Sequence, residues 1–262
     1  DLHSTSRRQR QMCIRDRSLI IMNIAVIFAG GTGTRMNSKE KPKQFLRMHD
    51  KPIIIHTLEK FQNNENIDAI VIACIKEWIN YLSYLIDYYH ISKVKKIVPG
   101  GETGQMSIYA GLNAAKEISY DNNAVVLIHD GVRPLINNDV INDNIESVIH
   151  NGSAITSVNV TETIMEVNDD KSIRYIPDRT HSRLARAPQS FFLDEILSVH
   201  NKALSEGKKD FIDSCTLMSY YGKKMYLIDG PIENIKVTTP QDFYIMRAIL
   251  DAQENSQIYG LE

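Results

Sequence analysis

A short glycine-rich stretch, AGGTGTRMNSKEKPKQ, occupies residues 29–44 directly after the apolar run NIAVIF. A dinucleotide-binding fingerprint needs G-x-G-x-x-G, but Met36 stands where the third glycine would be, and the P-loop pattern G-x-x-x-x-G-K-[S/T] is absent. The stretch instead combines glycine N–H groups with three nearby cations, Arg35, Lys41 and Lys43. Backbone donors and fixed cations together suit a polyphosphate. A plain turn with a solvated basic face stays open as the alternative.

A carboxylate at the end of a second apolar run indicates a cation site. In VLIHDGVRP, residues 126–134, Asp130 closes the run, and a buried carboxylate is costly unless it is paired or binds a cation. With phosphates nearby, Asp130 is predicted to bind Mg²⁺, which prefers hard oxygen ligands. Arg133 leaves a second interpretation open, a simple Asp–Arg pair that closes a turn. His129 is interpreted as a hydrogen-bonded core histidine rather than as a catalytic group.

Two further stretches carry polar groups where a nucleotide could meet them. In PGGETGQMSIYAGL, residues 99–112, a glycine pair ends a strand, and backbone groups with Glu102 or Ser107 could contact a base edge. A loop that only joins a strand to a helix is the alternative. In ENIKVTTPQD, residues 233–242, Lys236 lies in an apolar segment that is predicted to be a short strand. This lysine either points into solvent or meets an anion in a cleft, and taken alone the outward orientation is favoured.

The elements that must position these residues alternate along the chain. Apolar runs typical of strands are separated by segments of helical periodicity, which predicts a mostly parallel sheet covered by helices on both faces. Ligands bind at the carboxyl ends of the strands in such sheets, and both the glycine stretch and Asp130 come at strand ends. The expected strands are 23–28, 69–75, 95–100, 124–130 and 154–160, and the expected helices are 53–62, 77–88, 105–117 and 138–150.

The alternation changes at 160–180, where TETIMEVNDDKSIRYIPDR is typical of two β-runs joined by an Asn-Asp-Asp turn. This hairpin is too polar for a core, and it is either a surface hairpin or an arm that packs on a partner subunit. Helices near 192–205 and 211–221 and a strand at MYLIDG follow. The motif TTPQD indicates the start of a closing helix at about 240. Residues 22–258 are expected to form a single domain.

Composition narrows the class of protein. The chain has 262 residues and a formal net charge of −2, without the basic excess of a nucleic-acid or anionic-membrane binder. No apolar run reaches the ~18 residues that span a bilayer. Its cysteines, Cys13, Cys74 and Cys215, lack metal-ligand spacing, which favours reduced thiols in the cytoplasm. Residues 1–21 are basic and polar, and QMCIRDR resembles translated adapter sequence, so this leader is expected to be disordered and outside the fold.

Taken together and in this order, the motifs resemble those of the cytidylyltransferases that act on 2-C-methyl-D-erythritol 4-phosphate and on ribitol 5-phosphate. The glycine loop with R-M and P-K-Q is followed by G-G, H-D-x-x-R-P, D-R, P-Q and N-I-K-V-T, over about residues 23–250. The resemblance implies a Rossmann-like α/β domain, similar to nucleotide-diphosphate-sugar transferases, with a protruding β-arm at about 160–180 that forms a homodimer. It also implies CTP and an alditol phosphate as substrates, Mg²⁺ as the cofactor, and no nucleic-acid or membrane partner.

The resemblance implies a role for each matching residue. The residues expected to hold the CTP phosphates and stabilise the transition state are Arg35, Lys43 and Lys236, with Asp130 as the Mg²⁺ ligand. Those expected to bind the nucleotide are Ala29, Gly30, Gly31, Gly33, Gly101, Glu102 and Ser107. Those expected to contact the alditol phosphate are Arg133, Thr163 and Arg179, the last in the neighbouring subunit's site. An acceptor phosphate is ionised at neutral pH, so its in-line attack on the α-phosphorus of CTP needs no Ser–His pair.

Some positions depart from the family pattern. Ala187 precedes Pro188-Gln189 where a threonine is usual, and ETGQM after Gly101 lacks a common arginine. The AGG opening and the V-R-P after Asp130 are more similar to the ribitol branch. Formation of CDP-ribitol, which would feed a surface polymer such as teichoic acid or capsule, is therefore favoured over formation of the isoprenoid precursor.

Two other classes of protein are weighed against this interpretation. A glycosyltransferase of similar fold would need a D-x-D metal pair, but Asp130-Gly131-Val132 has only the first aspartate. A non-catalytic nucleotide-binding module would not need Lys43, Lys236 and Arg179 together.

Overall fold

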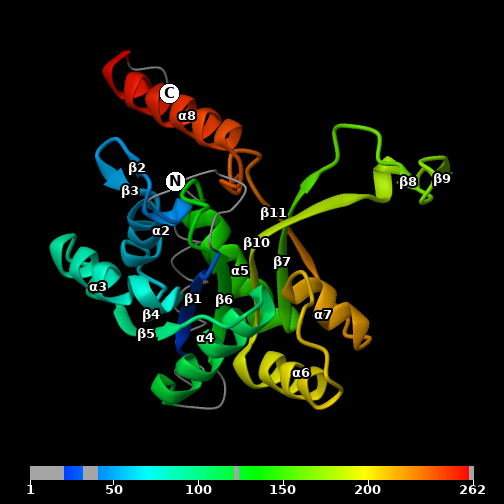
Figure 1. Ribbon diagram of the computed structural model, residues 1–262, viewed down its shortest axis with the longest axis horizontal. Coiled ribbons are helices and arrows are strands. Elements are labelled where there is room, and N and C mark those ends of the chain that lie inside the picture. Colours follow the sequence, from blue (N-terminus) through cyan, green and yellow to red (C-terminus); the bar gives the residue numbers. More distant parts are fainter. Residues whose placement is uncertain (1–20, 32–40, 121–123, 260–262) are drawn as a thin grey trace, which may run out of the picture.

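Seven strands pair into one sheet in the computed structural model, which describes residues 21–31, 41–120 and 124–259 (Figure 1). The strand order is β11-β7-β10-β6-β1-β4-β5. Neighbouring strands run parallel except where β10 pairs with β6 and with β7. The strands are β1 (Asn23–Ala29), β4 (Ala69–Cys74), β5 (Val94–Pro99), β6 (Val125–Asp130), β7 (Ser153–Asn159), β10 (Arg183–Phe192) and β11 (Leu227–Asp229).

Helices cover both faces of this sheet. One face packs against α2 (Ile53–Gln62), α3 (Ile79–Tyr88) and α5 (Asn138–Asn151), and the other against α4 (Gly104–Ile118), α6 (Leu193–Ser205) and α7 (Ser214–Tyr220). Successive side chains of a strand point to opposite faces, so Ala25 and Ile27 of β1 join the first core, while Ile24 and Val26 join the second. Burial on both faces explains why the strands are continuously apolar in sequence.

The last helix, α8 (Pro240–Tyr259), projects from the body of the molecule (Figure 1). The Asp242 carboxylate accepts hydrogen bonds from the backbone N–H groups of Thr238 and Thr239, so the helix starts where TTPQD indicates. Near its start, Met246 packs with Val237 and Val132 in a third apolar cluster. This contact fixes the chain segment before α8 against the loop that follows β6.

A hairpin leaves the sheet between β7 and β10 and extends away from the body (Figure 1). It contains β8 (Glu166–Val167) and β9 (Ile173–Tyr175), which pair antiparallel, and is followed by the 3₁₀ turn η4 (Arg179–His181). The backbone N–H of Asn168 donates to the carbonyl of Ser172 across the turn. The predicted hairpin is therefore confirmed, and we call residues 160–182 the arm.

The remaining short elements connect these parts. They are η2 (Lys43–Phe45), β2 (Arg47–Met48), β3 (Lys51–Pro52) and η3 (Lys76–Trp78), the last of which replaces the first turn of the helix predicted at 77–88. Of the predicted leader, Ile21 is described and packs against the first core. Residues 1–20 lie outside the described residues.

Two features of the fold differ from the sequence prediction. The segment NIKV, residues 234–237, is not a strand, and the backbone N–H of Val237 instead donates to the Val132 carbonyl beyond β6. Strand β10 was not expected, although it is the antiparallel strand between β6 and β7. Its sequence carries three charged or amide side chains among its apolar ones, so it lacks the continuous apolar run of a central parallel strand.

Candidate active site

Two glycine loops come into contact at the carboxyl ends of β1 and β5. A Cβ atom added to Gly30 would lie 2.8 Å from the Ser107 Oγ, and one added to Gly100 would lie 3.0 Å from the same atom and 3.6 Å from the Gly30 Cα. Added to Gly101, it would collide with Met106. Only glycine fits these positions without a shift of the backbone or of Ser107, so the loops form a close-packed floor of exposed backbone.

Ser107 holds the second loop in place. Its Oγ accepts a hydrogen bond from the Gly101 N–H over 3.1 Å and donates to the Thr103 carbonyl over 3.0 Å. The side chain is buried, whereas Glu102 beside it is exposed. The structure thus brings together Ala29, Gly30, Gly101 and Ser107, with Ser107 acting on the shape of the loop. Gly33 and Arg35 lie outside the described residues.

Lys43 lies beside the first loop. The 3₁₀ turn η2 folds back so that Gln44 Nε2 donates to the Ala29 carbonyl over 2.7 Å. A Cβ atom on Gly31 would lie 4.0 Å from the Lys43 Cε, and Lys43 itself is buried. Lys41, in contrast, lies 5.8 Å from the centre of the Tyr81 ring. Of the two lysines, Lys43 is the one that borders the glycine floor.

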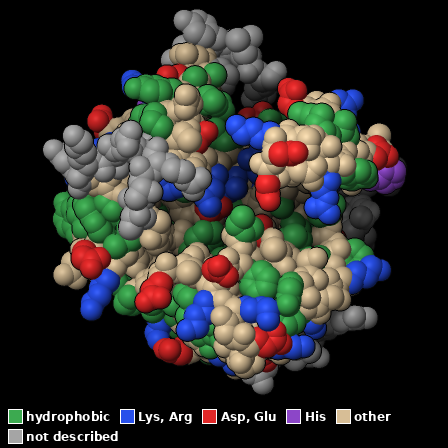
Figure 2. All heavy atoms as spheres, turned by 45° about the vertical axis from the view of Figure 1, so that its right-hand side comes forward, with side chains coloured by type: hydrophobic (Ala, Val, Ile, Leu, Met, Phe, Trp, Pro, Cys, Tyr) green, Lys and Arg blue, Asp and Glu red, His purple; other side chains and the backbone are tan. Residues whose placement is uncertain are grey.

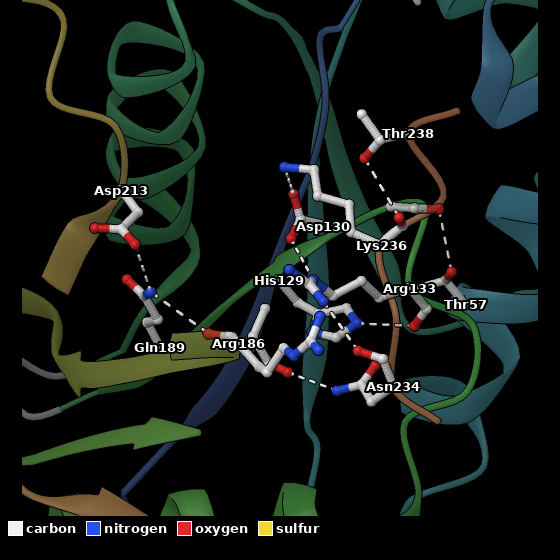
Figure 3. Close-up of polar contacts among 12 residues, drawn as sticks. Thr57, His129, Asp130, Arg133, Arg186, Gln189, Asp213, Asn234, Lys236 and Thr238 are labelled. Atoms are coloured by element: carbon white, nitrogen blue, oxygen red, sulfur yellow. Dashed lines mark hydrogen bonds and ion pairs between the residues drawn. The ribbon is translucent and has the colours of Figure 1, made fainter. Parts of the chain in front are cut away.

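Asp130, at the end of β6, contacts two cations, Arg133 three residues later and Lys236 from a distant part of the chain (Figure 3). Its Oδ1 lies 2.5 Å from the Lys236 Nζ, and its Oδ2 accepts from the Arg133 Nε over 2.7 Å. Arg133 also donates from Nη1 to the Asn234 carbonyl over 2.9 Å, which ties residues 234–236 to the loop after β6. The Asp–Arg pair expected as an alternative is present, and Lys236 points to Asp130 rather than into bulk solvent.

The charge state of this cluster follows from its contacts. Burial raises the pKa of Asp130. The positive charges of Lys236 and Arg133 and their hydrogen bonds lower this pKa by more, so that it lies well below the ordinary value. Asp130 is therefore a permanent carboxylate near neutral pH. Burial lowers the pKa of His129 to about 4, and its Nε2 lies 3.1 Å from the Arg133 carbonyl. His129 is a neutral core histidine, as expected.

Asp130 is a suitable, though minimal, ligand for Mg²⁺. Within the described residues, no group of three or more His, Cys, Asp or Glu side chains could hold a metal ion by itself. Mg²⁺ in phosphate-transfer sites needs only one or two carboxylates, because substrate phosphates and water complete its shell. A carboxylate offers about four lone-pair sites, so the two ion pairs of Asp130 leave room for one metal contact.

Sequence reasoning missed three residues, Arg186 and Gln189 of strand β10 and Asn234 of the segment before α8. Arg186 is half-buried beside Arg133, Gln189 bonds to Asp213 over 3.1 Å, and Asn234 Nδ2 donates to the Ala187 carbonyl of the same strand over 2.8 Å (Figure 3). The sequence signal for Arg186 was weak, because an arginine is usually solvated. Lys and Arg side chains gather around a hollow on this face of the molecule (Figure 2).

The arm carries the two remaining predicted residues. Thr163 is exposed, and Arg179 donates from Nη1 to the Thr161 carbonyl over 3.3 Å while staying exposed. In the described part of the chain, no contact joins either residue to Asp130 or Lys236. Several large apolar side chains of the arm are more than half exposed, namely Met165, Val167, Ile173, Tyr175 and Ile176.

The sequence of this chain is similar to that of known cytidylyltransferases over most of its length. Residues 23–252 match the family described as IspD, 2-C-methyl-D-erythritol 4-phosphate cytidylyltransferase. The chain is 57% identical over 241 residues to ribitol-5-phosphate cytidylyltransferase of Streptococcus agalactiae serotype V, covering 92% of this chain and all of that protein. It is 39% identical over 230 residues to 2-C-methyl-D-erythritol 4-phosphate cytidylyltransferase of Clostridium botulinum, covering 87% of this chain and 97% of that protein.

The fold is similar to that of a solved structure, 4-diphosphocytidyl-2C-methyl-D-erythritol synthase from Anaerococcus prevotii. The TM-score is 0.77 at 24% identity, over 88% of this chain and 96% of that one. This likeness bears out the Rossmann-like α/β fold expected from the sequence. Among the described residues, no helix is both long and apolar enough to span a bilayer.

Proposed function

The chain belongs to the IspD family of cytidylyltransferases, and we propose that it transfers the cytidylyl group of CTP to D-ribitol 5-phosphate, forming CDP-ribitol and pyrophosphate. The observation that carries the choice of acceptor is the identity of 57% with the ribitol relative, against 39% with the methylerythritol relative. Transfer to 2-C-methyl-D-erythritol 4-phosphate, for isoprenoid precursor synthesis, is the second candidate, because the matching family carries that name.

In this proposal the glycine floor binds the nucleotide. The backbone at Ala29, Gly30 and Gly101 comes close to the base because side chains are absent or turned away there. Glu102 adds an exposed carboxylate at the rim, and Ser107 keeps the loop in its shape. Gly31 and Lys43 bind the triphosphate, and the family motif assigns Gly33 and Arg35 to the same task.

The chemical step requires two anions to meet. A phosphate oxygen of the acceptor attacks the α-phosphorus of CTP, the bond from that phosphorus to the bridging oxygen of the β-phosphate breaks, and pyrophosphate leaves. Lys236 stabilises the charge that builds up on the α-phosphate, since Asp130 holds its ammonium group at the end of β6. The nucleophile is ionised already, so proton removal by a side chain is not needed.

Asp130 is the residue that would hold a divalent cation, Mg²⁺ in this proposal. When bound, such an ion neutralises charge on the triphosphate and so favours attack by a second anion. The low pKa of Asp130 keeps its carboxylate ionised and ready for this contact. Asp130 thus has two roles in the proposal, orienting Lys236 and Arg133 as well as binding the metal.

The acceptor site is shared between two subunits in this proposal. Arg133 lies in the body of one subunit, and the partner's arm supplies Thr163 and Arg179. The exposed apolar side chains of the arm support this role, because such a patch on a protruding hairpin favours packing against another protein surface. CTP is an intracellular nucleotide, so the proposal places the homodimer in the cytoplasm.

A panel of acceptors tests the proposal. The enzyme is incubated with CTP and Mg²⁺ alone, or with ribitol 5-phosphate, 2-C-methyl-D-erythritol 4-phosphate or xylulose 5-phosphate, and pyrophosphate release is measured. We expect release with ribitol 5-phosphate and background release with CTP alone. Release with methylerythritol phosphate only would show that the second candidate is correct. If no acceptor supports release, the proposed transfer is wrong.

A further inference from the structure

Arg186 occupies an irregular part of β10. Ala185 pairs with Ser157 of β7 and Gln189 pairs with Ile155, so four steps along β10 match two along its neighbour. The extra residues form a bulge, which bends the strand and redirects the side chains within it. Figure 3 shows the result, with Arg186 reaching from β10 toward Arg133 and Asn234.

In the described ranges of the chain, the guanidinium group of Arg186 has no protein acceptor. Its Nε is buried without a hydrogen-bond partner, and among the described residues no carboxylate or carbonyl accepts from this side chain. The Nε of Arg183, on the same strand, also lacks a partner, but the guanidinium of Arg183 differs because its Nη2 bonds to Asp229 and to the Ser157 carbonyl. A half-buried guanidinium with five donors and no acceptor is costly, so the site lacks a group that would accept from it.

The charge of Arg186 and of its neighbour Arg133 favours an anion as the missing group. Burial, followed by the charge of Arg133, lowers the pKa of Arg186, yet arginine stays protonated in proteins. The carboxylate that Arg133 contacts, Asp130, is already shared with Lys236. Arg186 therefore faces a second guanidinium, that of Arg133, without a carboxylate of its own, and a dianion such as phosphate would relieve the repulsion between the two cations.

The position of Arg186 in the sheet decides which phosphate this is. The glycine floor and Lys43 lie at the ends of β1 and β5, whereas β10 lies on the other side of β6 from β1. In-line attack requires the nucleophile to approach opposite the leaving pyrophosphate, which the proposed function places along Gly31 and Lys43. The β10 side of Asp130 is then the side from which the acceptor phosphate enters.

We propose that Arg186 binds the phosphate group of the alditol phosphate acceptor, as a substrate-binding residue supplied by the same subunit as Asp130 and Lys236. This inference rests on the proposed function, because it takes the acceptor to be an alditol phosphate. The two guanidinium groups have separate tasks. Arg133 is held by Asp130 and Asn234, whereas Arg186 keeps its planar fork free for bidentate contact with phosphate oxygens.

Steady-state kinetics of Arg186→Met test this assignment. Methionine keeps most of the apolar stem and removes the charge, so the KM for ribitol 5-phosphate should rise by about 10- to 100-fold, as for the loss of a charged hydrogen bond. The KM for CTP should stay within about twofold, because the nucleotide lies on the other side of β6. Arg186→Lys should recover part of the loss, since lysine keeps the charge but not the fork.

Inhibition by inorganic phosphate tests whether Arg186 binds the phosphate group of the acceptor or its hydroxyl groups. Phosphate should inhibit the wild-type enzyme in competition with the acceptor, and its inhibition constant should rise in Arg186→Met by a factor similar to that of the acceptor KM. Arg183→Met is the matched control, because Arg183 has protein acceptors of its own, and both constants should keep their wild-type values.

The outcomes separate this inference from the proposed function. If the wild-type enzyme releases no pyrophosphate with any alditol phosphate, the proposed function has failed. If it is active but Arg186→Met keeps the wild-type acceptor KM, or changes only the KM for CTP, the assignment of Arg186 is wrong. An unchanged phosphate inhibition constant would also overturn it. Thermal unfolding checks each variant, and Arg186→Lys carries the comparison if Arg186→Met does not fold.

Discussion

At the scale of single residues, the site is organised around one carboxylate. Asp130 holds Lys236 and Arg133 at 2.5 and 2.7 Å, although Lys236 is more than a hundred positions further along the chain. An ion pair to a buried carboxylate adds little net stability, because desolvation offsets most of the attraction. In the proposed mechanism its value lies in orientation, since a lysine fixed in this way needs no reorganisation when charge develops on a phosphate.

Replacing Lys236 tests this role. Lys236→Ala should lower the rate of pyrophosphate release by about 10²–10³-fold, the usual effect of removing one group that stabilises the transition state. The fold should persist, because Asp130 keeps Arg133 as a partner. A pyrophosphate-release assay measures the rate, and circular dichroism shows whether the variant is folded. A near-wild-type kcat would contradict the role given to Lys236.

A second residue-scale feature is His200, which has no part in the site. It is buried in α6 and stacks on Tyr109, and neither of its ring nitrogens has a hydrogen-bond partner within the part of the chain that the structure describes. Burial lowers its pKa from 6.5 to about 4. The unfolded chain therefore binds a proton between these two pH values while the folded chain does not, and stability falls as the pH falls through this window.

His200→Phe should remove this pH dependence in part. Between pH 6.5 and pH 4 the variant should lose about 3 kcal/mol less stability than the wild type, because each unit of pKa shift corresponds to about 1.4 kcal/mol. Urea unfolding at both pH values measures the difference. His150→Gln is the control, since it also removes one histidine but at an exposed position on α5. An identical pH profile for His200→Phe and wild type would refute the prediction.

At the scale of elements, the site depends on a segment without regular secondary structure. Residues 231–239 cross the ends of β6 and β10, and Asn234 joins the two. Its carbonyl accepts from Arg133, and its side-chain Nδ2 donates to the Ala187 carbonyl. Asn234 is fully buried, so neither hydrogen bond can be replaced by bulk water. This asparagine keeps Lys236, two positions later, at the right distance from Asp130.

Asn234→Ala should therefore affect stability and turnover together. The Ala187 carbonyl would lose its buried donor, which costs about 1–3 kcal/mol in the free energy of unfolding. Turnover should fall as well, because the segment that carries Lys236 loses an anchor. Urea denaturation and the pyrophosphate assay measure the two effects. Asn151→Ala, at the exposed end of α5, should change stability by less than about 0.5 kcal/mol. A normal stability of Asn234→Ala would show that the anchor is dispensable.

At the scale of the whole molecule, the proposed homodimer gives the arm a role. A hairpin that projects from the body and exposes its apolar side chains would gain stability by packing on another surface. In a symmetric dimer each arm would reach the other subunit's site, so that each site would contain Lys236 from one chain and Arg179 from the other.

Mixing two inactive variants tests this sharing. Lys236→Ala and Arg179→Ala should each be nearly inactive as homodimers. After subunit exchange, half of the dimers are mixed and one of their two sites is intact, so about a quarter of wild-type activity should return. Light scattering confirms the dimer, and Lys236→Ala mixed with itself is the control. A mixture with no recovered activity would show that each site is built within one chain.

Local pattern was sufficient for much of this protein. Continuous apolar runs and helical periodicity predicted the parallel strands, the helices and the hairpin, because burial on one or both faces of an element leaves a periodic trace in sequence. The same logic located the glycine loops and Asp130 at strand ends. The order of these motifs then indicated the family.

Only the tertiary structure decided which residues come together in the site. NIKV looked like a strand, yet residues 234–237 lie outside the sheet and bring Lys236 to Asp130. Strand β10 has a mixed sequence and a bulge, so no periodicity indicated that it enters the sheet antiparallel and places Arg186 beside Arg133. The sequence determined by itself what lies at the end of each apolar strand, because that depends on local burial. The contacts between cations on different strands depend on how distant segments pair. Such pairing has no local pattern in the sequence.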